Sequence, residues 1–100
     1  MSLHFLLVQI RPLVSMSLER LIPFLAKSIR RRREQLCLSH AEVASLTGLS
    51  PEYLEFIEKG STMMSMKTLT TVADALRYAP SELIEQAEKL AESDGESDQT

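Results

Sequence analysis

A helix start, a helix stop and a second helix start follow one another between Ser39 and Pro51. Ser39-His40-Ala41-Glu42 matches the capping box, in which a serine hydroxyl and a glutamate carboxylate satisfy free N–H groups at a helix start. Gly48 can adopt the positive φ that ends a helix, and Ser50-Pro51 then places an N-cap before a proline in the first turn. The spacing predicts two short helices, near 40–47 and 51–58, joined by a tight turn.

The chain before this turn has the apolar period of another helix. Four aliphatic side chains share one helical face, with Lys27 and the run Arg30 to Arg32 mostly on other faces, at Leu21, Leu25, Ile29 and Leu36. Pro23 fits only the first turn of a regular helix, because proline lacks the N–H that an interior position donates. We therefore expect this helix from about residue 23 to 36.

Two more helices are predicted after Gly60, which ends the helix at 51–58. Ser65 is an N-cap, and a helix near 66–76 would bury one stripe of side chains, formed by Met66, Leu69, Val72, Ala73 and Leu76. Pro80-Ser81 breaks the chain and caps it again before a helix near 82–92. No strand is expected within the domain, residues 17–92, so the predicted fold is all-α with five helices.

Residues 1–16 stand apart from this helical pattern. Leu3 to Val14 reads LHFLLVQIRPLV, an apolar run that is too short to span a membrane and that Arg11-Pro12 interrupts. It lacks the basic start and the small-residue cleavage site of a signal peptide. Three interpretations stay open: an arm or strand that makes dimer contacts, an apolar flap on the domain, and leader sequence upstream of a start at Met16.

Charge is unevenly distributed along the chain. Residues 82–100 hold seven acids and one base, or −6, whereas residues 17–81 hold nine bases and seven acids, or +2. Arg11 completes the net charge of −3. Because the acidic end sets the overall balance, that balance does not argue against a nucleic-acid partner. The last residues, ESDGESDQT, include no apolar side chain, and we expect a disordered acidic tail over 93–100.

The two short helices around Gly48-Leu49 have the features of a helix-turn-helix. Ala44 is small enough to let the second helix approach the first, and Leu49 would fill the gap between them. A shared core is predicted from Val43, Leu54 and Ile57.

The stretch from Ile29 to Leu76 resembles the Xre/Cro-type (lambda repressor-like) helix-turn-helix domain of bacterial regulators. The positions that carry the resemblance are Arg33 near the end of the first helix, Ser39-His40, Val43-Ala44, Gly48, Glu58-Lys59-Gly60 and Ser65-Met66-Lys67-Thr68-Leu69. The resemblance implies a DNA-binding domain. It also implies a structural ion pair between Arg33 and Glu58. The run Arg30 to Arg33 could form a phosphate clamp, but consecutive helical residues point in different directions, so we expect Arg30, Arg31 and Arg32 to be solvated.

In that family the base-facing residues lie early in the second helix of the pair. The resemblance therefore implies that the bases of double-stranded DNA face Ser50, Pro51, Glu52, Tyr53, Glu55 and Phe56. It implies phosphate contacts from the start of the preceding helix and from the loop that follows, to which we add Lys67, giving Ser39, His40, Lys59, Ser61, Thr62 and Lys67.

The sequence departs from the family at functional positions. Glu52, Glu55 and Phe56 stand where glutamine, arginine, serine or asparagine is usual. Glutamate can accept a hydrogen bond from cytosine and an aromatic ring can contact the thymine methyl, but two carboxylates oppose binding to a polyanion. Cys37 stands where the family often has glycine, which predicts a small strain if that residue is left-handed.

Two functional hypotheses follow. The first is a sequence-specific DNA-binding regulator, acting in the cytoplasm as a homodimer on a palindromic operator, because one small domain buries too little surface for tight specific binding. The second copy would contact a stripe on the last helix, at Leu83, Ile84, Ala87 and Leu90, with residues 1–16 as the competing surface. The alternative is a protein-interaction module on the same scaffold, suggested by the acidic and aromatic residues at 52–56.

Catalysis, cofactors and metals are not expected. His40 has no convincing second ligand at helical spacing, and Cys37, the single cysteine, has no positioned base and cannot form an internal disulfide. No phosphate-binding glycine loop or catalytic carboxylate pair is present either.

Overall fold

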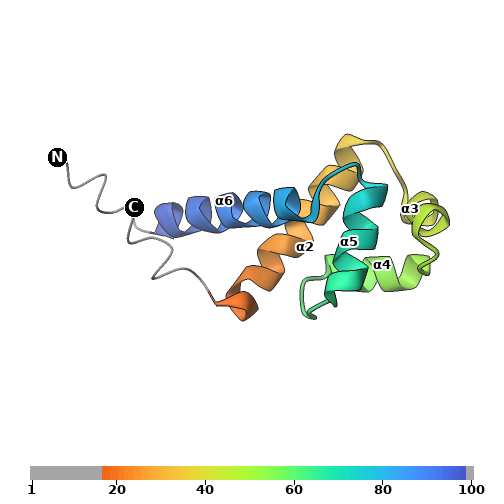
Figure 1. Ribbon diagram of the computed structural model, residues 1–100. Helices are drawn as coiled ribbons and strands as arrows, with labels where there is room; N and C mark the ends of the chain where they lie inside the picture. Colours follow the sequence, from red (N-terminus) through yellow and green to blue (C-terminus); the bar gives the residue numbers. More distant parts are fainter. Residues whose placement is uncertain (1–16, 99–100) are drawn as a thin grey trace.

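The computed structural model describes residues 17–98. Its helices are α2 (Leu18–Gln35), α3 (His40–Thr47), α4 (Pro51–Glu58), α5 (Met66–Ala75) and α6 (Pro80–Asp98). The described part of the chain contains no strand, so the all-α, five-helix prediction is confirmed there. Figure 1 shows α2 and α6 crossing at one end of the molecule, with α3, α4 and α5 gathered at the other.

Three serines begin helices as the sequence predicts. The Ser39 hydroxyl accepts from the Glu42 N–H at 3.0 Å while the Glu42 carboxylate accepts from the Ser39 N–H at 2.9 Å, which completes the capping box of α3. Ser50 caps α4 by accepting from Tyr53, and Ser65 caps α5 by accepting from Thr68. Each cap satisfies an N–H group that has no partner within its helix.

The first helix begins earlier than expected. α2 starts at Leu18, and Pro23 lies inside it rather than in its first turn. Proline removes one hydrogen bond, but the carbonyl that loses it belongs to Glu19, which is exposed and can bond to water. Leu21 packs against the core in the preceding turn, and this packing keeps the backbone helical.

The last helix differs at both ends. It begins at Pro80, and the Glu82 carboxylate accepts from the N–H of Ala79, the residue before the helix, at 2.8 Å. Pro80 is therefore the first helical residue, and Ser81 is not the cap. The helix continues to Asp98 instead of ending near 92, and it passes through Gly95. The predicted arm at 1–16 and the end of the predicted tail, 99–100, lie outside the described residues.

One core joins all five helices. The largest fully buried side chains come from four of them and from the residue that ends α5: Val43, Ile57, Val72, Leu76 and Leu83. Met66 is the exception within its predicted stripe, because its side chain is 66% exposed. Among the described helices, none has the length and hydrophobicity needed to cross a membrane.

Ser28 supplies a polar connection that the sequence did not indicate. It is buried on α2, and its hydroxyl lies 2.9 Å from the Leu25 carbonyl and 3.1 Å from the Leu83 carbonyl of α6. A buried hydroxyl needs such a partner, so Ser28 fixes how closely α6 packs on α2.

Candidate nucleic-acid interface

The turn between α3 and α4 is fixed by backbone geometry and one side chain. Gly48 has a φ of +80°, and a side chain added there would meet nothing within 4 Å, so conformation rather than space requires glycine. Thr47 donates its hydroxyl to the Val43 carbonyl at 2.8 Å and accepts from the Leu49 N–H at 3.1 Å. The chain therefore reverses over Thr47, Gly48 and Leu49.

The predicted shared core of the two helices is confirmed. Val43, Leu54 and Ile57 are 1–2% exposed, and Ala44 and Leu49 pack against them. Burial of Leu54 and Ile57 fixes the rotation of α4 about its axis. Its opposite face is left to solvent.

That outer face carries most of the predicted base-facing residues. Ser50, Glu52, Glu55 and Phe56 are exposed, with Phe56 at 45%. Tyr53 differs, because it is only half-exposed and packs against the core. The face is therefore a short strip of two carboxylates, one hydroxyl and one aromatic ring.

Most of the predicted phosphate positions are exposed. Lys59 and Ser61 are exposed directly after α4, and Lys67 is exposed in the first turn of α5. The first turns of α3 and α4 contain Glu42 and Glu52, whereas that of α5 contains no acid. Because a helix N-terminus attracts anions, the start of α5 has the most favourable field of the three for a phosphate.

A cluster of three charged or polar side chains holds α2, α3 and α4 together. Arg33 donates to Glu58 through Nε at 2.7 Å and Nη2 at 2.9 Å, and its third donor, Nη1, reaches the Leu38 carbonyl at 2.8 Å. The side chains of Arg33 and Glu58 are only 13% and 9% exposed. The predicted ion pair is confirmed as a bidentate, largely buried interaction.

His40 belongs to this cluster. Its Nε2 lies 3.0 Å from Glu58 Oε1, and the ring is half-buried. Burial raises the pKa of Glu58, but the hydrogen bonds from Arg33 and His40 outweigh it and hold the pKa below its ordinary value. The same hydrogen bond between Arg33 and Glu58 raises the pKa of Arg33, because it stabilises the charged guanidinium.

Arg32 has a structural role that the sequence analysis missed. Its Nε donates to the Leu76 carbonyl at 2.9 Å, and its guanidinium lies 4.1 Å from the centroid of the Tyr78 ring. It thus caps the end of α5 and stacks on an aromatic ring. The expectation that Arg32 is solvated is wrong, whereas Arg30 forms only an exposed ion pair with Glu34.

The predicted dimer stripe on α6 divides into two parts. Leu83 and Ala87 are 0% exposed in the core of their own chain, so a second copy cannot reach them. They face α2, which has more contacts with α6 than any other helix. Ile84 and Leu90 are half-exposed, and only these two members of the stripe are accessible.

Within residues 17–98, no group of three His, Cys, Asp or Glu side chains is placed to hold a metal ion. Cys37 is exposed, and His40 already contacts Glu58.

Comparisons with known proteins agree with this geometry. A family model described as Helix-turn-helix (HTH_3) matches residues 29–83, more than half of the chain. The clp gene regulator ClgR from C. glutamicum is similar in structure, with a TM-score of 0.65 and 26% identity, over 74% of this chain and 92% of that one. The restriction-modification controller protein C.AhdI from Aeromonas hydrophila has a TM-score of 0.59 and 31% identity, over 64% of this chain and 96% of its own.

A third structure, of FeII HppE in complex with substrate, has a TM-score of 0.57 and 30% identity over 62% of this chain, but only 35% of HppE is covered. A search of curated proteins found no match. The family match, the two regulators covered almost end to end and the Gly48 turn agree: the chain belongs to the Xre/Cro-type helix-turn-helix family HTH_3.

Proposed function

We propose that this protein is a sequence-specific DNA-binding transcriptional regulator that acts as a homodimer on a palindromic operator, by binding rather than by catalysis. The observation that carries the proposal is the outer face of α4, left free by the burial of Leu54 and Ile57, with Lys59 exposed at the end of α4 and Lys67 exposed in the first turn of α5. ClgR is a gene regulator and C.AhdI a restriction-modification controller, and both support a regulatory role.

Docking α4 in the major groove would bring its first turns to the base edges. Glu52 could accept from cytosine N4, and Phe56 could contact a thymine methyl. Lys59, Ser61 and the start of α5 would contact the phosphates on one side. In this arrangement the carboxylates select sequences and the lysines supply affinity, because a carboxylate is repelled by every phosphate and is compensated only by a matching base.

A homodimer would place two copies of α4 about one helical turn of DNA apart. The half-exposed Ile84 and Leu90 of α6 are the surface that we propose for the second copy. Two domains are needed because a single one offers too small an interface for tight specific binding.

One observation favours a second candidate function, a protein-interaction module. Glu52, Glu55 and Phe56 form an acidic and aromatic strip on α4 that contains no cation. Such a strip suits a basic protein surface with an apolar pocket as well as it suits a base sequence.

Selection from random double-stranded DNA, followed by gel shifts on the selected site, tests the proposal. We expect a selected palindrome, weaker binding to all sequences by Lys59→Ala, and higher non-specific affinity with blurred specificity for Glu52→Gln. Lys89→Ala and Glu85→Gln on α6 are matched controls, because they remove the same charges from the exposed pair Glu85–Lys89. If no sequence is selected, and Glu52→Gln with Glu55→Gln abolishes capture of a protein partner instead, the second function replaces the first.

A further inference from the structure

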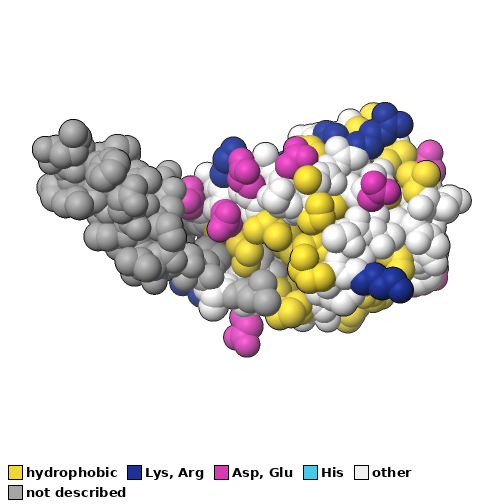
Figure 2. Space-filling view, in the orientation of Figure 1, with side chains coloured by type: hydrophobic (Ala, Val, Ile, Leu, Met, Phe, Trp, Pro, Cys, Tyr) yellow, Lys and Arg dark blue, Asp and Glu magenta, His cyan; other side chains and the backbone are white. Residues whose placement is uncertain are grey.

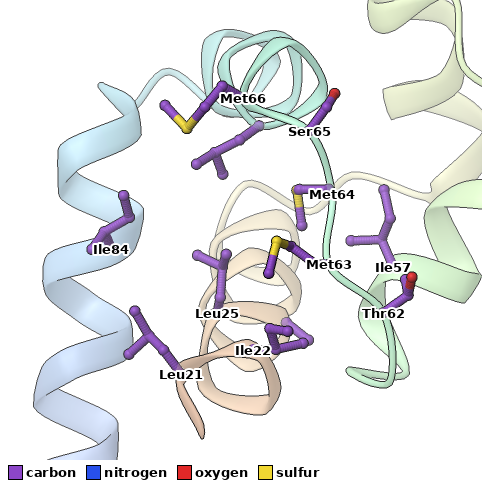
Figure 3. A pocket seen from close by; sticks show the side chains of 12 residues that line it. Leu21, Ile22, Leu25, Ile57, Thr62, Met63, Met64, Ser65, Met66 and Ile84 are labelled. Carbon is purple, nitrogen blue, oxygen red and sulfur yellow. The ribbon is translucent and has the colours of Figure 1, made fainter. Parts of the chain in front are cut away.

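An apolar groove lies between α2, α6 and the loop that joins α4 to α5. Its volume is about 330 Å³, and it is lined by Leu21 and Ile22 of α2, Met63 and Met64 of the loop, Met66 of α5 and Ile84 of α6. Figure 3 shows these side chains converging on one hollow from the separate elements. In Figure 2, hydrophobic side chains form a band across the middle of the molecule.

The groove leaves large apolar side chains in water. Met63 is 53% exposed and Met66 is 66% exposed, although both are flexible side chains that pack readily against an apolar partner. Neither is needed to fill the chain's own core. Met63 and Met66 therefore form an exposed apolar surface on one side of the groove.

The lining also indicates what kind of occupant fits. Of its polar members, Ser65 already uses its hydroxyl as the cap of α5, accepting from the Thr68 N–H at 3.1 Å. A small-molecule site usually has several polar groups placed to orient its ligand. The lining contains no charged side chain, so it favours a continuous apolar segment.

This chain contains such a segment shortly before α2 in the sequence. Leu3 to Val14 is mostly aliphatic, and residues 3–10 include no lysine, arginine, aspartate or glutamate. It joins α2 just before Leu18, and Leu21 and Ile22 follow within the next turn. An extended residue spans roughly 3.3 Å, so the few residues between Val14 and Leu18 are enough to turn the chain back over the groove.

We propose that Leu3 to Val14 docks in cis into this groove and covers Met63 and Met66. Attachment to α2 gives the segment an effective concentration of about millimolar order at the groove, which favours its own chain over a second copy. The segment would also cover Ile84, which leaves Leu90 as the accessible apolar residue of α6 for dimer contacts.

The docked segment would brace the loop that carries Ser61 and Thr62. The significance of this bracing for DNA rests on the proposed function, because those two residues are the proposed phosphate contacts. The docking itself does not, and the measurements below use no DNA, so failure of one proposal is distinguishable from failure of the other.

A tryptophan reporter in the full chain tests the docking. The sequence has no tryptophan, so Phe5→Trp introduces a single emitter into the segment. We expect blue-shifted emission, which moves to the wavelength of water-exposed indole when Met63→Glu and Met66→Glu are added. Leu46→Glu on α3, where the side chain is 62% exposed and outside the groove, is the matched control and should leave the emission unchanged.

Three results would overturn the proposal. Phe5→Trp alone could emit at the wavelength of water-exposed indole, or its emission could stay the same when Met63→Glu and Met66→Glu are added. It could also become blue-shifted only as protein concentration rises, which would assign the groove to the segment of a second copy. Far-UV circular dichroism establishes that each variant is folded.

An apolar dye provides a second measurement that does not depend on the reporter. In the full chain, Leu6→Ser, Leu7→Ser and Ile10→Ser together should weaken docking and increase the fluorescence of anilinonaphthalene sulfonate several-fold. Adding Met63→Glu and Met66→Glu should abolish that increase. No increase with the serine variant would contradict the docking.

Discussion

Glu58 connects three helices of the interface region. It belongs to α4, accepts two hydrogen bonds from Arg33 of α2 and contacts His40 of α3. Removing its carboxylate would leave Arg33 with two unpaired donors in a place where little water can reach it. The orientation of α4 relative to α2 and α3 therefore depends on this one carboxylate.

Glu58→Ala should lower the free energy of unfolding by about 2–4 kcal/mol, because it strands a buried charge. Glu34→Ala is the control: it removes the carboxylate of the Arg30–Glu34 pair, whose side chains are 63% and 55% exposed. An exposed pair is worth about 0–1 kcal/mol. Chemical denaturation measures both, and a loss below about 0.5 kcal/mol for Glu58→Ala would mean that the buried pair contributes as little as an exposed one.

The same residue sets a pH dependence. The pKa of Glu58 is lower in the folded protein than the ordinary value of 4.5, so the carboxylate stabilises the fold fully above that value. The contribution is lost as pH falls through the lowered pKa. We expect the difference in unfolding free energy between the parent and Glu58→Gln to be largest at neutral pH and to shrink in acid. Urea titrations at a series of pH values measure it, and a difference that stays constant would contradict the assignment.

Cys37 holds a conformation that favours glycine. Its φ is +58°, and α2 ends there with hydrogen bonds from the Leu38 N–H to the Arg33 carbonyl and from the Cys37 N–H to the Glu34 carbonyl. The predicted left-handed position is thus present. Cys37→Gly should raise the free energy of unfolding by about 0.5–1 kcal/mol, because glycine adopts this φ without a steric cost.

Two controls accompany Cys37→Gly. Arg77 has a φ of +61° at the equivalent end of α5, so Arg77→Gly should also stabilise the protein. Gly48→Ala should destabilise it, because alanine must then adopt the φ of +80°. A stability of Cys37→Gly equal to or below that of the parent would show that strain at this residue is negligible.

Single residues were predictable where their signal is local. The caps Ser39, Ser50 and Ser65 were recognised because each acts on an N–H within a few residues. The partners of Arg32 and His40 were not, since Leu76, Tyr78 and Glu58 meet them only after the helices pack. Arg33 was recognised through family resemblance rather than through any local pattern.

At the scale of elements, α3, α4 and α5 were predicted to within one residue, whereas α2 and α6 were not. Short helices bounded by strong caps are specified by their own sequence. α2 continues through Pro23 because tertiary packing of Leu21 outweighs one lost hydrogen bond. This packing forms only when α2 meets the other helices, so the local sequence around Pro23 does not reveal it.

The start of α5 is a proposed phosphate-binding element, and its role can be tested through Lys67. Its first turn contains Lys67 and no acid, unlike the starts of α3 and α4. Lys67→Ala should weaken binding to specific and random DNA by the same factor, because a phosphate contact carries no sequence information. Fluorescence anisotropy on both duplexes measures this, with Lys89→Ala as the control. A loss confined to the specific site would place Lys67 near a base instead.

At the scale of the whole molecule, α6 lies against α2 and buries Leu83 and Ala87. Leu90 remains half-exposed on this pair of helices. If Leu90 forms the two-fold contact, Leu90→Asp should convert the dimer into a monomer that retains its helicity. Sedimentation equilibrium measures the state of association. A Leu90→Asp chain that stays dimeric would move the contact to residues 1–16, the competing surface.

The charge distribution of the proposed dimer would determine how its binding to DNA responds to salt. If the exposed Lys59 and Lys67 are the phosphate contacts of each protomer, a dimer would bring four lysines to the phosphates. With a slope of about −0.9 per neutralised phosphate, log K should fall with log salt concentration with a slope of roughly −3 to −5. Lys59→Ala removes two of the four and should reduce the slope by about 2. Glu52→Gln should leave the slope nearly unchanged while raising affinity, because a carboxylate near DNA repels phosphate without releasing a counterion. A parent slope steeper than about −7 would mean that further cations, such as Arg30 and Arg31 of α2, also contact the DNA backbone. The DNA-binding surface would then extend beyond α4.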